Sequence, residues 1–141
     1  VDDVGGILQL IEPLEKDGTM VKRSRTEIER DIGLYTVIEH DGVIFACAAL
    51  YAYPEAKTAE MAALTVSTQV QGQGDGERVL KRIEQRARAD KLESIFVLTT
   101  RTTHWFRKRG FTLVDPDWLP EARKRKYNWD RKSQVLVKRL T

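Results

Sequence analysis

What the sequence has little of already excludes several classes of protein. Its single cysteine, Cys47, cannot close an internal disulfide or build a cysteine-based zinc site. No apolar run reaches the roughly 18–20 residues that span a bilayer, and no group of His, Asp and Glu has the spacing of metal ligands. The start, Val1-Asp2-Asp3, lacks the basic and apolar regions of a signal peptide. We therefore expect a cytoplasmic protein with no membrane partner and no metal.

The composition is that of one globular domain. Hydrophobic residues make up 41% and charged residues 32% of the 141 residues. We find no repeat, low-complexity tract or linker, so a single domain over residues 1–141 is expected. The net charge of +3 is unevenly spread, because residues 121–139 hold eight Lys and Arg against two acids. Such a segment binds the phosphates of a nucleic acid or a cofactor, or is a solvated surface.

Hydrophobic spacing and turn residues predict an α/β (α+β) fold in which helices flank a mixed sheet. Apolar residues at helical spacing follow Asp2-Asp3, and a capping box of Ser24 and Glu27 opens a short helix to about Ile32. Asp41-Gly42 predicts a hairpin within a meander of three antiparallel strands. Strands are expected at 34–39, 43–53, 58–67, 94–99, 111–114 and 135–140, and further helices at 75–90, from Thr102 or Thr103 to Arg109, and from Pro120.

A glycine-rich turn, Gln71-Gly72-Gln73-Gly74-Asp75-Gly76-Glu77, joins an expected strand to an expected helix. A helix N-terminus presents unpaired N–H groups, and glycines let the backbone approach an anion, so this arrangement predicts a phosphate-binding cradle. The turn lacks the Gly-Lys-Ser/Thr of a Walker A loop and the G-x-G-x-x-G spacing of a dinucleotide-binding fold. A strand-to-helix loop without a ligand is the alternative.

The pattern Q-x-x-G-x-G at Gln71, Gly74 and Gly76 resembles the acyl-CoA-binding motif of the GNAT family of N-acetyltransferases. Leu64-Thr65-Val66 and Arg109-Gly110-Phe111 resemble further motifs of that family. The resemblance implies a mixed, mostly antiparallel sheet with a splayed centre, here without the family's first strand. It also implies acetyl-CoA as donor. The residues implied to bind it are Ala63, Leu64 and Val66 in the strand and Gln71, Gly72, Gly74, Gly76 and Glu77 in the turn.

Longer segments are similar to the acetyltransferase domains of bacterial N-acetylglutamate synthases, most specifically Leu-Thr-Thr-Arg at 98–101 followed by His-Trp-Phe at 104–106. Those enzymes normally also carry an arginine-binding, kinase-like domain. None is present here, so we expect an excised domain or a short stand-alone form. The resemblance implies acetylation of the α-amino group of L-glutamate, the first step of arginine synthesis. It also implies that Arg23, Arg131 and Ser133 hold glutamate, and arginine forks suit its two carboxylates.

Acetyl transfer to an amine needs a base, a donor for the oxyanion and an acid, and the sequence offers candidates for these roles. An amine attacks a thioester only when neutral, so a base must take its proton. Glu60 is the candidate, and an ion-paired strand glutamate is the alternative. A backbone N–H near Ala63 or Leu64 would polarise the thioester carbonyl. Phe106 stands where many GNAT enzymes have tyrosine, so the acid that protonates the thiolate stays open among Tyr127, Ser133 and solvent.

The remaining candidates favour structural roles. Cys47 is expected in the core, His40 exposed in the hairpin turn, and His104 structural. Trp118 and Trp129 flank the basic segment, where they either pin a loop or stack on single-stranded nucleic acid. Three alternatives stay open: a GNAT enzyme with another amine acceptor, a CoA-binding domain without catalysis, and a nucleic-acid-binding module. The main interpretation has small-molecule partners and no nucleic acid, and leaves a homo-oligomer open.

Overall fold

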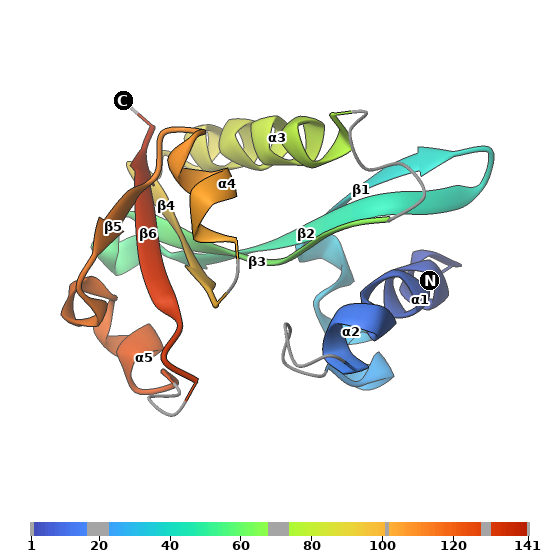
Figure 1. Cartoon of the computed structure of the whole chain (residues 1–141), viewed down its shortest axis with the longest axis horizontal. Helices are drawn as coiled ribbons and strands as arrows, with labels where there is room; N and C mark the ends of the chain where they lie inside the picture. Colours follow the sequence, from blue (N-terminus) through green and yellow to red (C-terminus); the bar gives the residue numbers. More distant parts are fainter. Residues whose placement is uncertain (1, 17–22, 68–73, 101, 128–130, 141) are drawn as a thin grey trace. The chain divides into compact units, whose positions relative to one another are not determined.

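The computed structural model describes residues 2–16, 23–67, 74–100, 102–127 and 131–140. Its strands follow the hydrogen-bonded order β1-β2-β3-β4-β6-β5 (Figure 1). None of the helices in these ranges is long and apolar enough to cross a membrane. The helices are α1 (Asp2–Lys16), α2 (Arg25–Arg30), α3 (Asp75–Ala89), α4 (Thr103–Arg107) and α5 (Glu121–Lys124), and the strands are β1 (Tyr35–His40), β2 (Val43–Tyr53), β3 (Thr58–Val66), β4 (Ser94–Thr99), β5 (Thr112–Val114) and β6 (Gln134–Arg139).

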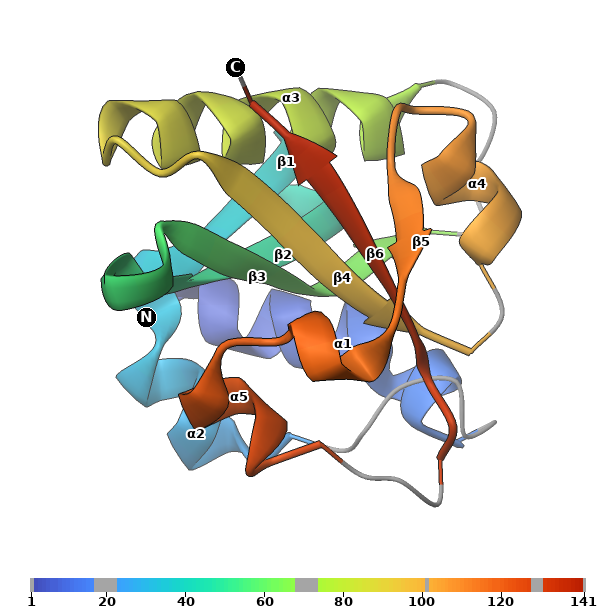
Figure 2. The same ribbon diagram turned by 90° about the vertical axis from the view of Figure 1, so that its left-hand side faces the viewer.

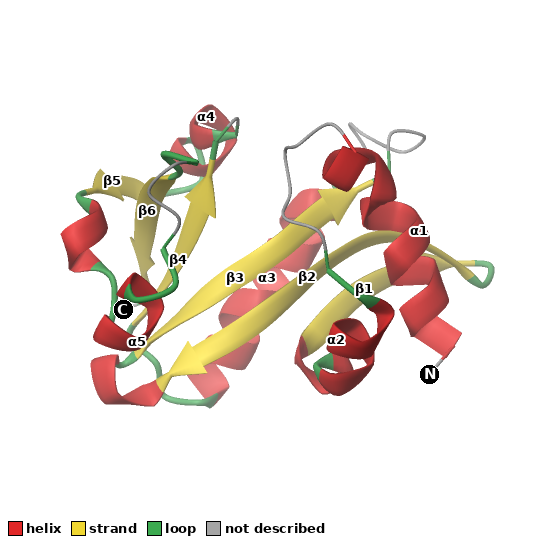
Figure 3. Ribbon diagram, turned by 90° about the horizontal axis from the view of Figure 1, so that it is seen from below, coloured by secondary structure: helices red, strands yellow, loops and turns green. Residues whose placement is uncertain are grey.

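Close contacts divide the chain into two compact units. Unit 1 comprises Val1–Leu50 and Met61–Arg86, and unit 2 comprises Tyr51–Glu60 and Ala87–Thr141. In unit 1, α1 and α2 cover one face of β1 and β2, and α3 covers the opposite face (Figures 1 and 3). The helices hold these positions through apolar stripes, since Ile7 and Ile11 of α1 are fully buried.

The local signals in unit 1 work as the sequence predicts. Ser24 accepts a hydrogen bond from the backbone N–H of Glu27, and the Glu27 carboxylate accepts one from the N–H of Ser24, which completes the capping box of α2. β1 and β2 pair antiparallel across Asp41 and Gly42, whose φ angles are +52° and +80°. Two successive positive φ angles are typical of a type I′ turn, which explains the Asp-Gly signal.

Unit 2 is built around β6, which lies between β4 and β5 and pairs antiparallel with both (Figure 2). The first residues of β3 pair parallel to β4, from Thr58 opposite Ser94 to Glu60 opposite Phe96. Antiparallel pairs therefore outnumber parallel ones, and the expected mixed, mostly antiparallel α+β fold is confirmed. One buried cluster of the unit contains Phe96, Leu119, Tyr127, Val135 and Val137.

The structure departs from the expected elements in a few places. Short 3-10 turns at Ile32–Leu34, Pro54–Ala56 and Pro116–Trp118 were not predicted. Two of them begin with proline, whose fixed φ suits a first helical position. The helix α4 ends at Arg107, short of the predicted Arg109. The hydroxyl of Thr102 does not cap it, because that oxygen lies 2.6 Å from the hydroxyl of Thr99. Pro120 precedes α5 as its N-cap residue.

Candidate functional site

The turn before α3 has the backbone that an anion cradle needs at its described residues. Gly74 has a φ of +82°, a left-handed conformation that glycine adopts without strain. A methyl group built onto Gly74 meets no heavy atom within 4 Å, so the space beside the residue is open. Gly76 is buried in the first turn of the helix, and Glu77 is exposed. Gln71 and Gly72 lie outside the described residues.

The side chain of Asp75 points into the protein rather than into the space beside the turn. Asp75 is 1% exposed, and its Oδ1 accepts a hydrogen bond from Nη1 of Arg78 at 2.5 Å. Its Oδ2 lies 3.7 Å from Nε2 of His40, which is exposed in the hairpin turn as expected. The guanidinium of Arg78 compensates the buried charge of the Asp75 carboxylate. The sequence analysis missed this ion pair, although the i,i+3 spacing of Asp and Arg could have indicated it.

The strand β3 contains a left-handed residue that is not glycine. Ala63 has a φ of +59°, a conformation that costs a residue with a Cβ roughly 1–2 kcal/mol. Its carbonyl oxygen accepts hydrogen bonds from Oγ1 of Thr65 at 3.1 Å and from Sγ of Cys47 at 3.6 Å. Left-handed residues in strands mark bulges, where the backbone groups leave the regular ladder. Cys47 is fully buried, as expected of a core residue, and burial raises the pKa of its thiol to about 12.

The carboxylate of Glu60 forms an ion pair that the sequence analysis did not predict. Nε of Arg123 lies 2.6 Å from Oε1 of Glu60, and Nη2 lies 3.5 Å from Oε2. The two side chains are only 11% and 17% exposed. Arg123 comes from α5, in the basic segment, where charge alone did not distinguish it from its neighbours. Both interpretations of Glu60 are compatible with this geometry, because a carboxylate paired with a guanidinium still has lone pairs that can accept a proton.

The charges of Glu60 and Arg123 also affect the pKa of Tyr53, a residue that the sequence analysis did not single out. Burial raises the pKa of the Tyr53 hydroxyl, and the negative charge of Glu60 raises it further, while Arg123 lowers it. Tyr53 lies at the end of β2, and its ring centroid is 6.0 Å from that of Phe96. Its hydroxyl therefore stays protonated at neutral pH and remains a hydrogen-bond donor.

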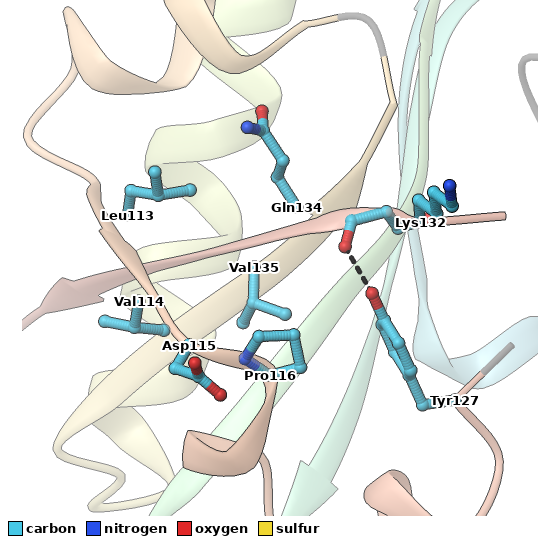
Figure 4. A pocket seen from close by; sticks show the side chains of 9 residues that line it. Leu113, Val114, Asp115, Pro116, Tyr127, Lys132, Gln134 and Val135 are labelled. Atoms are coloured by element: carbon cyan, nitrogen blue, oxygen red, sulfur yellow. Dashed lines mark hydrogen bonds between the residues drawn. The ribbon is translucent and has the colours of Figure 1, made fainter. Parts of the chain in front are cut away.

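Of the three residues expected to hold glutamate, Arg23 belongs to unit 1, and Arg131 and Ser133 belong to unit 2. In unit 1, the backbone N–H of Arg23 donates to Oε2 of Glu15 at 2.8 Å, and the residue is partly buried. In unit 2, Arg131 is partly buried and Ser133 is buried. The carbonyl oxygen of Ser133 accepts a hydrogen bond from the Tyr127 hydroxyl at 2.6 Å (Figure 4). The Tyr127 proton is thus engaged, which leaves Tyr127 a poor candidate for protonating a thiolate.

Ser133 lines a shallow pocket of about 530 Å³ in unit 2. The pocket lies beside β5 and the start of β6, and polar and apolar side chains share its wall (Figure 4). Its lining residues are Leu113, Val114, Asp115, Pro116, Tyr127, Lys132, Ser133, Gln134 and Val135.

Several described aromatic residues of unit 2 pack against one another or against arginine. Phe106 is buried between the rings of Trp105 and Phe111, with centroids 5.0 and 5.1 Å away. Arg109 stacks over the Trp105 ring at 3.8 Å. Trp118 packs edge-on against Phe96, so it pins its loop, and Trp129 lies outside the described residues. His104 is exposed, and the described part of the chain contains no group of three His, Cys, Asp or Glu that could hold a metal.

The chain is similar to known acetyltransferases. The chain is 62% identical over 140 residues to an amino-acid acetyltransferase of Ralstonia nicotianae, and 49% identical over 137 residues to that of Escherichia coli K12. It also superposes on N-acetylglutamate synthase from Neisseria gonorrhoeae, solved with coenzyme A and N-acetyl-glutamate, with a TM-score of 0.95 and 42% identity.

These alignments cover nearly all of the chain but a small part of each relative. They include 99%, 97% and 99% of this chain, against 31%, 31% and 33% of the relatives. The chain therefore spans about a third of the length of the proteins it matches. The model of the acetyltransferase (GNAT) family matches residues 7–111, which include the left-handed residue of β3 and the turn before α3. The chain belongs to the GNAT family of acetyltransferases.

Proposed function

We propose that the protein transfers the acetyl group of acetyl-CoA to the α-amino group of L-glutamate, giving N-acetylglutamate. The observation that carries the proposal is the order of features along β3 and α3: a buried carboxylate, Glu60, then the left-handed Ala63, then the open turn at Gly74. The names of the relatives support the choice of substrate, since they include amino-acid acetyltransferases and an N-acetylglutamate synthase. Its partners are then small molecules, and a cytoplasmic location is part of the proposal.

The donor is proposed to bind at the turn before α3. The positive end of α3 and the backbone N–H groups around Gly74 and Gly76 suit the diphosphate of acetyl-CoA. The missing Cβ at Gly74 allows an oxygen to approach the main chain closely. Strand residues Leu64 and Val66 would pair with the pantetheine amides, while Gln71, Gly72 and Glu77 complete the set of donor-binding residues.

The reaction is a direct transfer. Glu60 takes the proton of the glutamate ammonium, directly or through a water, and the neutral amine then attacks the thioester carbonyl. A backbone N–H of Ala63 or Leu64 stabilises the oxyanion that forms. The attacking nitrogen loses its second proton to solvent or a protein group, the C–S bond breaks, and the leaving thiolate takes up a proton from the same kind of source. Arg23, Arg131 and Ser133 are proposed to hold the two carboxylates of the acceptor.

Thiol release in the presence of different amines tests this function. With acetyl-CoA, L-glutamate is expected to give rapid release of CoA, and aspartate, glutamine and lysine little. If another amine reacts faster, that amine is the acceptor instead of glutamate, and the protein is still an acetyl-CoA-dependent N-acetyltransferase. Calorimetry should show CoA binding with a shallow salt dependence. Tight nucleic-acid binding that weakens steeply with salt, without CoA binding, would favour the binding-module alternative.

A further inference from the structure

Two buried side chains meet at one carbonyl in the middle of β3. The hydroxyl of Thr65 and the thiol of Cys47 both donate to the carbonyl oxygen of Ala63. Cys47 is fully buried, and Thr65 and Ala63 are 4% and 8% exposed. All three residues belong to unit 1. No solvent competes for these hydrogen bonds, so they act at close to full strength on the backbone of Ala63.

The conformation of Ala63 needs such support. A residue with a Cβ and a φ of +59° is held there only when its surroundings determine it. A buried carbonyl oxygen that loses its partners also costs free energy. Removing the two donors would therefore let Ala63 relax toward ordinary strand geometry, which would turn the neighbouring peptide groups.

The state of the thiol agrees with its role as a donor. Burial raises the pKa of Cys47 to about 12, whereas the charge of Arg23 and a hydrogen bond with Thr65 lower it. Cys47 thus keeps its proton at neutral pH and is a donor throughout the working range.

We propose that Thr65 and Cys47 are positioning residues for acetyl transfer, which hold the left-handed backbone of Ala63 and thereby orient the N–H groups of Ala63 and Leu64. The inference rests on the proposed function, in which one of these N–H groups stabilises the oxyanion. The N–H group that stabilises the oxyanion must point at the oxygen on which negative charge develops. Because that charge is present only as the transition state is reached, the orientation of the N–H group affects the rate more than binding. Loosening it should therefore lower kcat and leave substrate binding nearly unchanged.

The central test compares Thr65→Val, which removes the hydroxyl at similar shape, with Thr65→Ser, which keeps it. We expect Thr65→Val to lower kcat about tenfold or more, with both KM values within about twofold of wild type. Thr65→Ser should retain kcat within about threefold. Cys47→Ala removes the weaker donor and should lower kcat about two- to threefold. An equal kcat in Thr65→Val and wild type would overturn the proposal, and so would a change confined to KM.

A second readout does not depend on turnover. Hydrogen exchange of the Ala63 and Leu64 amides, followed by NMR, should become faster in Thr65→Val and stay slow in Thr65→Ser. If Thr65→Val does not fold, Cys47→Ala carries the test, and unchanged kcat together with unchanged exchange refutes the role. If the wild-type protein acetylates no glutamate, the proposed function fails, while the exchange measurements still show whether the two side chains hold Ala63.

Discussion

Nε of Arg123 lies 2.6 Å from Oε1 of Glu60, and both side chains are largely removed from solvent. The strand residue proposed as the base is therefore fixed by a residue from α5, about sixty positions later in the chain. The arrangement orients the carboxylate and ties the basic segment to β3 within unit 2. Mutations of the two residues should therefore have different effects, because Glu60 is proposed to act on the reaction whereas Arg123 contacts Glu60.

Glu60→Gln tests the base. The amide cannot take a proton, so we expect kcat to fall by about two orders of magnitude or more while CoA still binds. Steady-state kinetics and calorimetry with CoA measure the two effects. Glu55→Gln, an exposed glutamate of the same unit, is the matched control and should behave as wild type. Normal turnover in Glu60→Gln would remove Glu60 as the base.

Arg123→Met tests the ion pair. The change leaves the Glu60 carboxylate largely buried without its cation, so we expect a loss of about 2–4 kcal/mol in the free energy of unfolding. Urea unfolding measures the loss. In the double variant Glu60→Gln/Arg123→Met, most of the loss should disappear, because no charge is left unpaired. A double variant that is as unstable as the sum of the two single changes would show that the residues do not interact.

Gly74→Val tests the cradle. The φ of +82° strains any residue with a Cβ, and the branched side chain enters the open space beside the turn. We expect the affinity for CoA to fall about tenfold or more, as measured by calorimetry. Gly33→Ala is the control, since Gly33 has no positive φ and no atom lies within 4 Å of the added methyl. Unchanged CoA affinity in Gly74→Val would place the diphosphate elsewhere.

Arg131→Ala tests the acceptor site. Losing a partly buried partner of a carboxylate costs on the order of 2–5 kcal/mol, so the KM for glutamate should rise about thirtyfold or more. The KM for acetyl-CoA should change little. Arg125→Ala removes an exposed arginine from the same basic segment and should leave both constants unchanged. A larger effect on acetyl-CoA than on glutamate would assign Arg131 to the donor.

Cys47 should resist thiol reagents in the folded protein. Burial raises its pKa to about 12, so at pH 8 almost none of it is thiolate, the reactive form. We expect an aromatic disulfide reagent to modify no thiol at pH 8 in buffer and one thiol per chain in denaturant. Reactivity should rise only as the pH approaches 12 or the protein unfolds. Rapid labelling of the native protein at pH 8 would contradict the buried position.

Local signals in the sequence were sufficient for most of the fold. The capping box at Ser24 and the Asp41-Gly42 turn were recognised because each depends on neighbouring residues alone. The 3-10 turns are less visible, since three residues give no periodicity to detect. The sequence predicts that α4 continues to Arg109, whereas the helix ends at Arg107 and a turn follows at 108–110.

The candidate site was predictable in its motifs and not in its contacts. Gly74 and Gly76 were predicted from their spacing and Glu60 from its place in a strand before the turn, and their roles remain predictions. The pairing of Glu60 with Arg123 and the hydrogen bond from Cys47 to Ala63 join residues far apart in sequence, and composition does not encode such partners. The left-handed Ala63 could not be foreseen either, because alanine carries none of the usual signals for a positive φ.

The backbone of Ala63 also limits which amino acids natural variation can place there. Glycine would relieve the steric cost at the expense of rigidity, whereas valine, isoleucine or threonine would crowd the main chain in this conformation. A saturation library at this position, sorted for growth that depends on the enzyme, should thus return only the smallest side chains.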